Sequence, residues 1–213
     1  MNELKKKNTI IKYSKLFNTN GLSPIRSGNI SIRHNLNNKN GFLITPSGKK
    51  NYELKVQDIV FVSLDGISEK NKKPSSEWGF HLALYKNTTC NAVVHAHSKF
   101  SVICSCLFKK IPSFHYMIAL IGAKEILSAE YALFGSKDLS KNIIKAIKGR
   151  KSCLIANHGQ ITIGNDLESA FELAEEVELL CEYYYYCRLY KKPSNISKIE
   201  MEKVLKKISN YKV

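Results

Sequence analysis

The sequence predicts an α/β protein with three layers, in which a central, mostly antiparallel sheet is covered by helices. Short strand-like runs arrive in a cluster early in the chain, and helical stretches lie between and after the later runs. That order favours a sheet packed between helices. The chain has neither a Gly-x-Gly-x-x-Gly motif nor a Walker A motif, so it does not resemble a Rossmann or P-loop protein.

The N-terminal part of the chain predicts a helix, three strands and a second helix. Ile10, Tyr13 and Phe17 lie on one face of the first helix, which Gly21 ends. Pro and Ser at positions 74–76 mark the start of the second helix. The expected ranges are a helix over 3–19, strands over 29–33, 41–45 and 58–62, and a helix over 76–87.

The remaining elements alternate between helix and strand. A long helix opens at Asp166 with an apolar stripe and ends before Pro193, and Ser197-Lys198-Ile199-Glu200 is a capping-box pattern that starts a last helix. The other expected ranges are a strand ending in His95-Ala96-His97, a helix over 99–107, a segment over 114–120, a helix over 136–148, and strands over 152–156 and 161–164.

Length and composition favour one globular domain over residues 1–213. No linker rich in Gly, Ser or Pro divides the chain, and 44% of its residues are hydrophobic. No apolar run is long enough to cross a membrane, and no signal-peptide pattern is present. The six cysteines are expected to be reduced thiols, since a chain of this size needs no disulfides to fold. We therefore expect a cytoplasmic protein without a membrane partner.

The formal net charge of +15 raises the possibility of an anionic partner. Lysines are scattered at both ends of the chain, and the aromatic block Tyr183-Tyr184-Tyr185-Tyr186 lies in a stretch rich in Glu. A nucleic-acid module would combine clustered basic and exposed aromatic residues. We therefore expect no nucleic-acid partner; a salt-dependent shift with oligonucleotides, independent of metal, would favour one.

Two histidines, His95 and His97, end a short apolar run. Residues i and i+2 of a strand point to the same face, so both imidazoles can reach one metal ion. Alternatively, one ring packs in the core while the other caps a backbone group. His158, which follows another apolar run, and Glu77, near a helix start, could complete a His3Glu set that suits zinc with an open position for chemistry.

Three small-residue turns could offer backbone N–H groups to an anion. Ser27-Gly28-Asn29 precedes a strand, Thr45-Pro46-Ser47-Gly48 follows one, and Ser75-Ser76 stands at a helix N-terminus beside Glu77. Each is also an ordinary turn composition. The other histidines are not expected to bind the metal. We expect His81 to pack in the core or support the ligands, and His115 to pack or to orient Tyr116. His34 is expected to be exposed to solvent in an Asn-rich turn.

Six ordered motifs make the chain resemble the class II aldolase/adducin family over nearly its whole length, and most of all the members that act on L-fuculose 1-phosphate. The motifs are Ser27-Gly28-Asn29-Ile30-Ser31, Leu43-Ile44-Thr45-Pro46-Ser47-Gly48, Pro74-Ser75-Ser76-Glu77-Trp78, Ala92-Val93-Val94-His95-Ala96-His97, His115-Tyr116-Met117-Ile118-Ala119 and Asn157-His158-Gly159.

The resemblance implies one Zn²⁺ per subunit and a phosphate site beside it. It also implies a C4 homotetramer with active sites between subunits, where Tyr116 comes from the neighbouring subunit and Tyr211 on the C-terminal tail closes over the substrate. Because the chain ends at Val213, that tail is short. The implied zinc ligands are Glu77, His95, His97 and His158, and the implied phosphate site comprises Gly28, Asn29, Ser47, Gly48, Ser75 and Ser76.

The implied reaction is reversible cleavage of a ketose 1-phosphate, L-fuculose 1-phosphate first, to dihydroxyacetone phosphate and an aldehyde such as L-lactaldehyde. As a hypothesis, Glu77 moves protons at dihydroxyacetone phosphate and Tyr116 exchanges a proton with the sugar C4 oxygen. Related alternatives are methylthioribulose-1-phosphate dehydratase and pentulose-phosphate 4-epimerase; similar epimerases carry Asp where this chain has Glu77. A non-catalytic, adducin-like interaction domain is a further alternative, which the three retained histidines disfavour.

Overall fold

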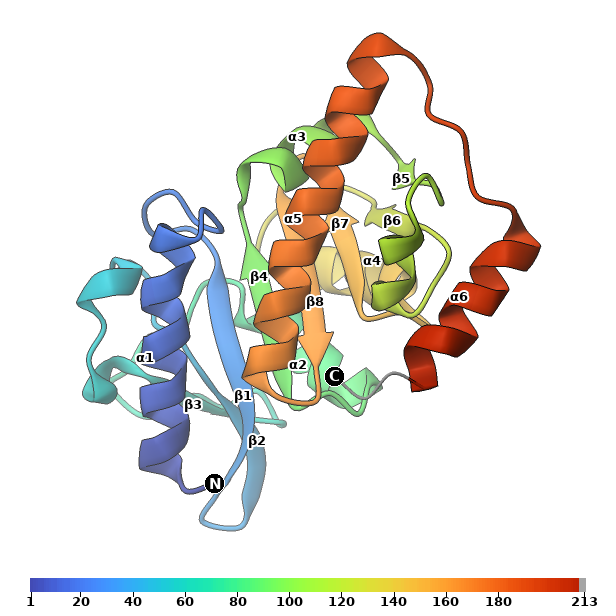
Figure 1. The fold of residues 1–213 in the computed structure, drawn as a ribbon. Coiled ribbons are helices and arrows are strands. Elements are labelled where there is room, and N and C mark those ends of the chain that lie inside the picture. Colours follow the sequence, from blue (N-terminus) through green and yellow to red (C-terminus); the bar gives the residue numbers. More distant parts are fainter. Residues whose placement is uncertain (211–213) are drawn as a thin grey trace.

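An eight-stranded sheet forms the centre of the computed structural model, which describes residues 1–210 (Figure 1). Its strand order is β3-β2-β1-β4-β8-β7-β6-β5, and each neighbouring pair is antiparallel except β6 and β7. The strands are β1 (Asn29–Leu36), β2 (Lys39–Ile44), β3 (Val60–Ser63), β4 (Ala92–Ala96), β5 (Lys110–Ile111), β6 (Ile126–Ala129), β7 (Ser152–Ile155) and β8 (Gly159–Gly164).

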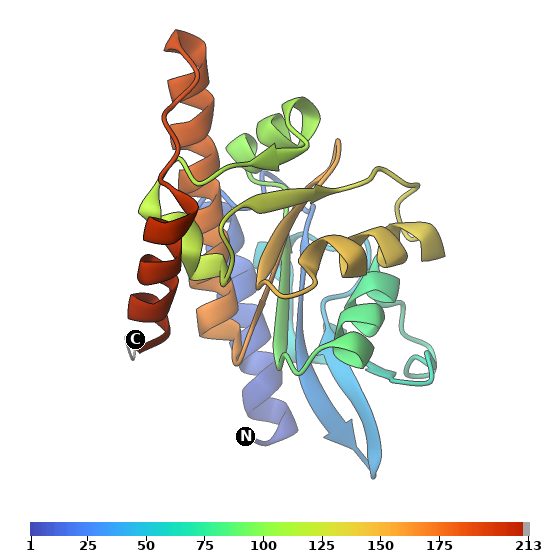
Figure 2. The same cartoon turned by 90° about the vertical axis from the view of Figure 1, so that its right-hand side faces the viewer.

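Helices cover both faces of the sheet. α1 (Glu3–Thr19) and α5 (Leu167–Tyr190) lie on one side, and α2 (Trp78–Asn87) and α4 (Lys137–Ile147) lie on the other (Figure 2). Alternation along β4 separates the two cores, because Val93 packs toward α2 and α4 whereas Val94 packs toward α1 and α5. The expected three-layer α/β arrangement is confirmed.

A third apolar cluster lies at the C-terminal side of the molecule. It joins α3 (Lys99–Leu107), the outer half of α5, the 3₁₀ helix η3 (Tyr116–Ile121) and α6 (Lys198–Asn210), whose buried Met201 packs into it. Short 3₁₀ turns η1 (Asn51–Glu53) and η2 (Val56–Asp58) precede β3. Among residues 1–210, no helix is both long and apolar enough to span a bilayer.

Most predicted elements are present, with a few differences. The helices over 3–19 and 99–107 have the expected bounds. The second helix begins at Trp78 rather than at residue 76, which leaves Glu77 in the N-cap position instead of the first turn. Residues 114–120 form mainly a 3₁₀ helix, and the pair β5 and β6 was not predicted, because two to four residues carry too little alternation to reveal a strand.

The prediction for His34 was wrong. Asn37 and Asn38 both have left-handed backbones, with φ of 49° and 62°, and they alone form the hairpin turn between β1 and β2. His34 therefore lies within β1, where its ring is largely buried and packs edge-on against Phe61. Burial lowers the pKa of this histidine.

Candidate metal and phosphate site

His95 and His97 lie at the end of β4, between β1 and β8. They continue the face of Val93, so their rings point toward α2, where Phe80 packs edge-on against His95 at 5.2 Å between ring centres. His95 is fully buried. The expected arrangement of two imidazoles on one strand face is present, with the Nε2 atoms of the pair 2.9 Å apart.

His158 reaches the same place from the turn between β7 and β8. Asn157 adopts a left-handed backbone with φ of 56°, which reverses the chain and lets Ile155 pair with Gly159. Gly159 packs so closely on β4 that a Cβ there would lie 2.4 Å from the carbonyl oxygen of Ala96. The His158 ring consequently lies edge-on to both other imidazoles, at 4.8 Å from His95 and 4.7 Å from His97.

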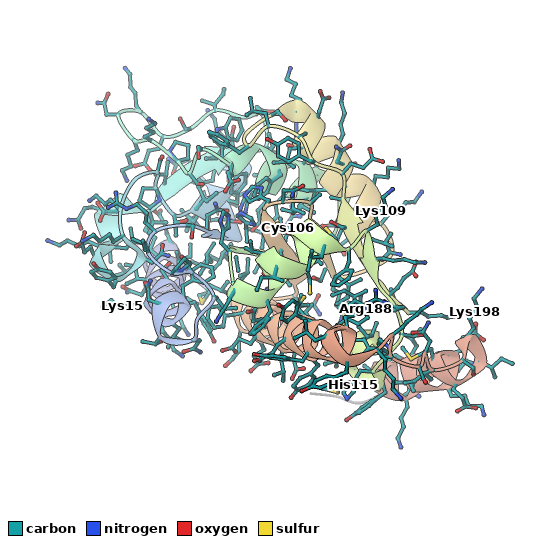
Figure 3. The ribbon with its side chains drawn as sticks, turned by 90° about the horizontal axis from the view of Figure 1, so that it is seen from above. Lys15, Cys106, Lys109, His115, Arg188 and Lys198 are labelled. Carbon is teal, nitrogen blue, oxygen red and sulfur yellow. The ribbon has the colours of Figure 1, made fainter. Side chains whose placement is uncertain are left out.

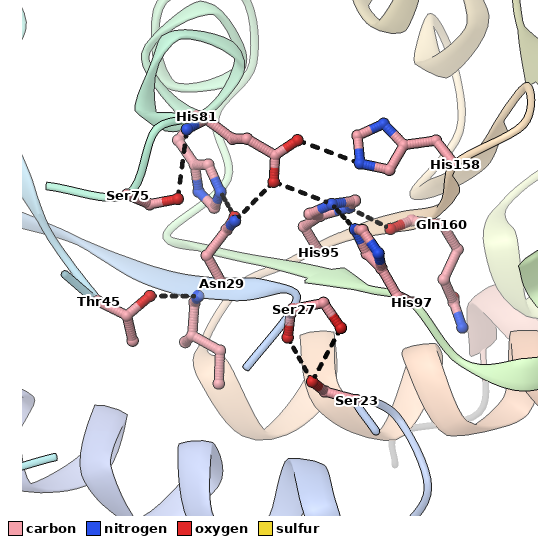
Figure 4. Close-up of polar contacts among 12 residues, drawn as sticks. Ser23, Ser27, Asn29, Thr45, Ser75, His81, His95, His97, His158 and Gln160 are labelled. Carbon is pink, nitrogen blue, oxygen red and sulfur yellow. Dashed lines mark hydrogen bonds and ion pairs between the residues drawn. The ribbon is translucent and has the colours of Figure 1, made fainter. Parts of the chain in front are cut away.

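Glu77 supplies the carboxylate from the start of α2. Its Oε2 lies 3.3 Å from His95 Nε2, and its Oε1 lies 3.1 Å from His158 Nε2. The ligand atoms of Glu77, His95, His97 and His158 all lie within 4.8 Å of one another (Figure 4). Side chains from three separated segments of the sequence thus form one group, as expected.

The protonation of this group fits a divalent cation. The Nδ1–H of His95 donates to the backbone oxygen of Gln160 at 2.8 Å, which leaves the lone pair of Nε2 facing the other ligands. Burial, with His95 and His158 nearby, lowers the pKa of His97 to about 3. Burial alone would raise the pKa of Glu77, but His95 and His158 hold it well below its ordinary value.

Three imidazole nitrogens and a carboxylate therefore converge on one point. Oε1 of Glu77 is buried without a hydrogen-bond partner among residues 1–210, although His158 Nε2 is near. Ligand atoms at such distances could share one cation, and imidazole nitrogens with a carboxylate oxygen suit zinc and similar ions.

The three expected phosphate loops lie together at the same end of the sheet. Backbone hydrogen bonds join the second loop to the third, from Ser47 N to Lys73 O at 3.1 Å and from Ser75 N to Thr45 O at 3.0 Å. Thr45 N in turn donates to Ile30 O at 3.1 Å. The first loop lies against the metal strand, since Gly28, with φ of 79°, would place a Cβ 2.6 Å from His95 O.

The side chains of this region do not all face outward as a phosphate site needs. Ser75 and Asn29 are buried, whereas Gly48 and Ser76 are exposed. The Oγ of Ser75 accepts from Glu77 N at 3.3 Å, and the amide of Asn29 contacts Glu77 Oε2 at 3.0 Å. The structure therefore ties two of the expected phosphate residues directly to the expected metal ligand.

Tyr116, the expected catalytic tyrosine within the described residues, does not lie among the metal ligands of its own chain. Tyr116 begins η3 on the side of α5 and α6, is 52% exposed, and packs against His115 with ring centres 4.9 Å apart. His115 caps η3 by accepting from Met117 N, and it lies beside α5 (Figure 3). Tyr211 lies outside the described residues.

Sequence reasoning missed Gln160. Its side chain is fully buried and donates to Ser98 Oγ and Ala174 O, both at 2.9 Å, while its backbone oxygen orients His95. It thereby ties the segment after His97 to α5. The signal was present in the sequence, because a lone glutamine within the apolar run of β8 must satisfy its amide inside the core.

A layered α/β fold with a buried His3Glu group at one end of its sheet defines a class of metal-binding α/β proteins. Within that class, the chain belongs to the family described as Class II Aldolase and Adducin N-terminal domain, whose model matches residues 8–185. The family and the three-layer fold expected from the motifs are both confirmed.

Several similar proteins are named as aldolases. The chain is 41% identical over 203 residues to 5-methylthioribulose-1-phosphate/5-deoxyribulose-1-phosphate aldolase of Rhodospirillum rubrum, covering 95% of this chain and 90% of that one. It is 40% identical over 193 residues to L-fuculose phosphate aldolase of Escherichia coli K12, covering 90% and 88%. A solved L-fuculose 1-phosphate aldolase superposes with a TM-score of 0.90 at 35% identity, covering 96% of each chain.

Proposed function

We propose that this protein is a metal-dependent aldolase that reversibly cleaves a ketose 1-phosphate to dihydroxyacetone phosphate and an aldehyde. The observation that carries the proposal is the convergence of Glu77, His95, His97 and His158 beside the three joined turns expected to bind phosphate. A single catalytic domain, residues 1–213, would carry every proposed site residue except those that a neighbouring subunit contributes.

The proposed cofactor is one Zn²⁺ per subunit, held by those four residues. When bound, it would supply Lewis-acid polarisation of the C2 carbonyl, where charge develops as the C3–C4 bond breaks. Glu77 would move the proton at C3, because its ionised carboxylate is held among the imidazoles. Gly28, Asn29, Ser47, Gly48, Ser75 and Ser76 would form the phosphate site. Ser47 and Ser75 would contribute their hydroxyl groups, because their backbone N–H groups already donate to Lys73 O and Thr45 O.

The proposed assembly is a homotetramer with active sites between subunits. Tyr116 is half-exposed at the start of η3 and would act on the C4 oxygen in a neighbour's site, and Tyr211 would close over the substrate. We place the protein in the cytoplasm, where its six free cysteines would stay reduced. Lys15, Lys109 and Lys198 lie on separate edges (Figure 3), a scatter that favours a sugar phosphate over a nucleic acid as anionic partner.

Three candidate substrates have specific support. L-fuculose 1-phosphate, which would yield L-lactaldehyde, is supported by the E. coli relative and the solved structure. A 5-deoxyribulose or 5-methylthioribulose 1-phosphate is supported by the relative from R. rubrum. The dehydratase and 4-epimerase alternatives would use the same ligands on a different bond, so product analysis separates them from an aldolase.

The test is to incubate zinc-loaded protein with these three ketose 1-phosphates and to follow dihydroxyacetone phosphate through a coupled dehydrogenase. We expect release from at least one of them, abolished by chelator and restored by Zn²⁺. Metal-dependent loss of water, or inversion at C4, would favour the alternatives. Absence of metal-dependent release from every member would refute the aldolase proposal.

A further inference from the structure

A buried chain of polar side chains leads from Glu77 away from the metal ligands and through the core between the sheet and α2. Asn29 Nδ2 lies 3.0 Å from Glu77 Oε2, and Asn29 Oδ1 contacts His81 Nε2. On the other side of that ring, His81 Nδ1 lies 2.7 Å from Ser31 Oγ, which lies 2.8 Å from Tyr85 OH. The four added side chains are at most 3% exposed, so water does not complete their hydrogen bonds.

Only one direction of hydrogen bonding satisfies this chain. An ionised carboxylate only accepts, so Asn29 must turn its NH2 toward Glu77 and its oxygen toward His81. Nε2 of His81 must then carry a proton. Burial, with His95 nearby, lowers the pKa of His81 to about 3, so the ring holds a single proton and Nδ1 accepts from Ser31 Oγ. Tyr85 OH in turn donates to Ser31.

The opposite arrangement would disrupt the ligand group. If the His81 proton moved to Nδ1, the lone pair of Nε2 would face Asn29 Oδ1, and the amide would be driven to flip. The flipped amide would present its oxygen to Glu77 Oε2, so that two acceptors would face each other in a dry site. The carboxylate would then turn away from the imidazoles.

We propose that His81 is a positioning residue: with Ser31, it fixes which way the Asn29 amide faces and thereby holds the Glu77 carboxylate toward the three histidines. Packing supports this role, because the His81 ring is stacked with Phe80 at 4.9 Å and Phe42 at 6.4 Å between ring centres. His81 is also one helical turn beyond Glu77, so α2 holds the carboxylate and the group that orients it.

The experiment compares His81→Phe, His81→Gln and the matched control His34→Gln. Phenylalanine keeps an aromatic ring stacked with Phe80 and Phe42 but lacks the Nε2–H that donates to Asn29. Glutamine can still donate an N–H to Asn29. Zn²⁺ affinity is measured on metal-free protein by competition with a chromophoric chelator. The kinetic constants kcat and KM are measured with the ketose 1-phosphate that the assay for the proposed function identifies as substrate. For His81→Phe we expect a loss of about 10–100-fold in Zn²⁺ affinity and kcat with little change in KM.

His81→Gln should recover most of both losses, and His34→Gln should match the wild type. A His81→Phe protein with wild-type Zn²⁺ affinity would overturn the proposal, as would equal losses in both His81 variants. The kinetic arm rests on the proposed function, but the affinity arm does not, so an inactive wild type would refute the function alone.

A second measurement keeps the proposal testable if His81→Phe does not fold. Long-range ¹H–¹⁵N spectra of ¹⁵N-histidine protein, assigned by comparison with His81→Gln, report which ring nitrogen carries the proton. We expect the proton on Nε2 in the wild type and a mixture of tautomers in Ser31→Ala. A wild-type proton on Nδ1 would contradict the proposed direction of the hydrogen bonds.

Discussion

His97 Nε2 lies 2.9 Å from His95 Nε2, with the Nδ1 proton of His95 already donated to Gln160 O. Two imidazole nitrogens held so close, beside the carboxylate of Glu77, form a group that should gain stability from a bound cation and lose it when the cation is removed. We therefore expect metal binding to be coupled to folding, as well as to the proposed chemistry.

Metal removal should lower the stability of the protein. A ligand present at one hundred times its Kd stabilises the folded state by about 2.7 kcal/mol. For a chain of this size, each kcal/mol shifts the melting temperature by about 2–4 °C. Calorimetry with Zn²⁺ and with chelator checks this expectation. His97→Ala should remove most of the difference, and a chelator effect of equal size in that variant would contradict the assigned ligand.

Glu77→Gln should abolish cleavage while leaving the fold intact. The amide keeps the shape of the side chain but can neither bind a metal as an anion nor move a proton, and loss of such a group costs about 10²–10⁴-fold in rate. The assay is dihydroxyacetone phosphate release at matched zinc content, with circular dichroism to verify folding. Full activity of Glu77→Gln with zinc bound would exclude the proposed role of the carboxylate.

The turn that carries His158 should not tolerate a side chain at position 159. Gly159→Ala would force a Cβ to 2.4 Å from Ala96 O, so the turn must move away from β4 and take His158 with it. We expect weaker Zn²⁺ binding, measured by chelator competition. The control is Gly79→Ala on α2, whose Cβ would meet nothing nearer than Ser140 Oγ at 3.8 Å; it should bind Zn²⁺ as the wild type does.

Acid should destabilise the metal-free protein. The pKa of His81 is lowered from 6.5 to about 3 by burial and by His95, which outweigh the opposing effect of Glu77. The unfolded chain therefore binds a proton before the folded one, so this stability is present above about pH 6.5 and is lost as pH falls toward about 3. Urea unfolding midpoints measured across this pH range give the dependence of stability on pH. His81→Gln should make that dependence weaker.

The sequence alone determined the family of this protein and identified the residues of its candidate metal site. A pair of histidines at alternate strand positions, Glu77 beside two serines and a histidine before Gly159 are local patterns, and their order along the chain carries the family. The helices over 3–19 and 99–107 could be predicted because apolar periodicity and end signals are local too.

Only the tertiary structure decided how those residues meet. Residues 77, 95, 97 and 158 converge because β4 pairs with β8 and α2 packs over their common face, relations between distant segments that no local pattern specifies. The same holds for His81, for which the sequence left packing and support of the ligands as open alternatives. His81 hydrogen-bonds to Asn29 because α2 packs against β1. This packing places a core histidine one residue away from Glu77 in the hydrogen-bond chain.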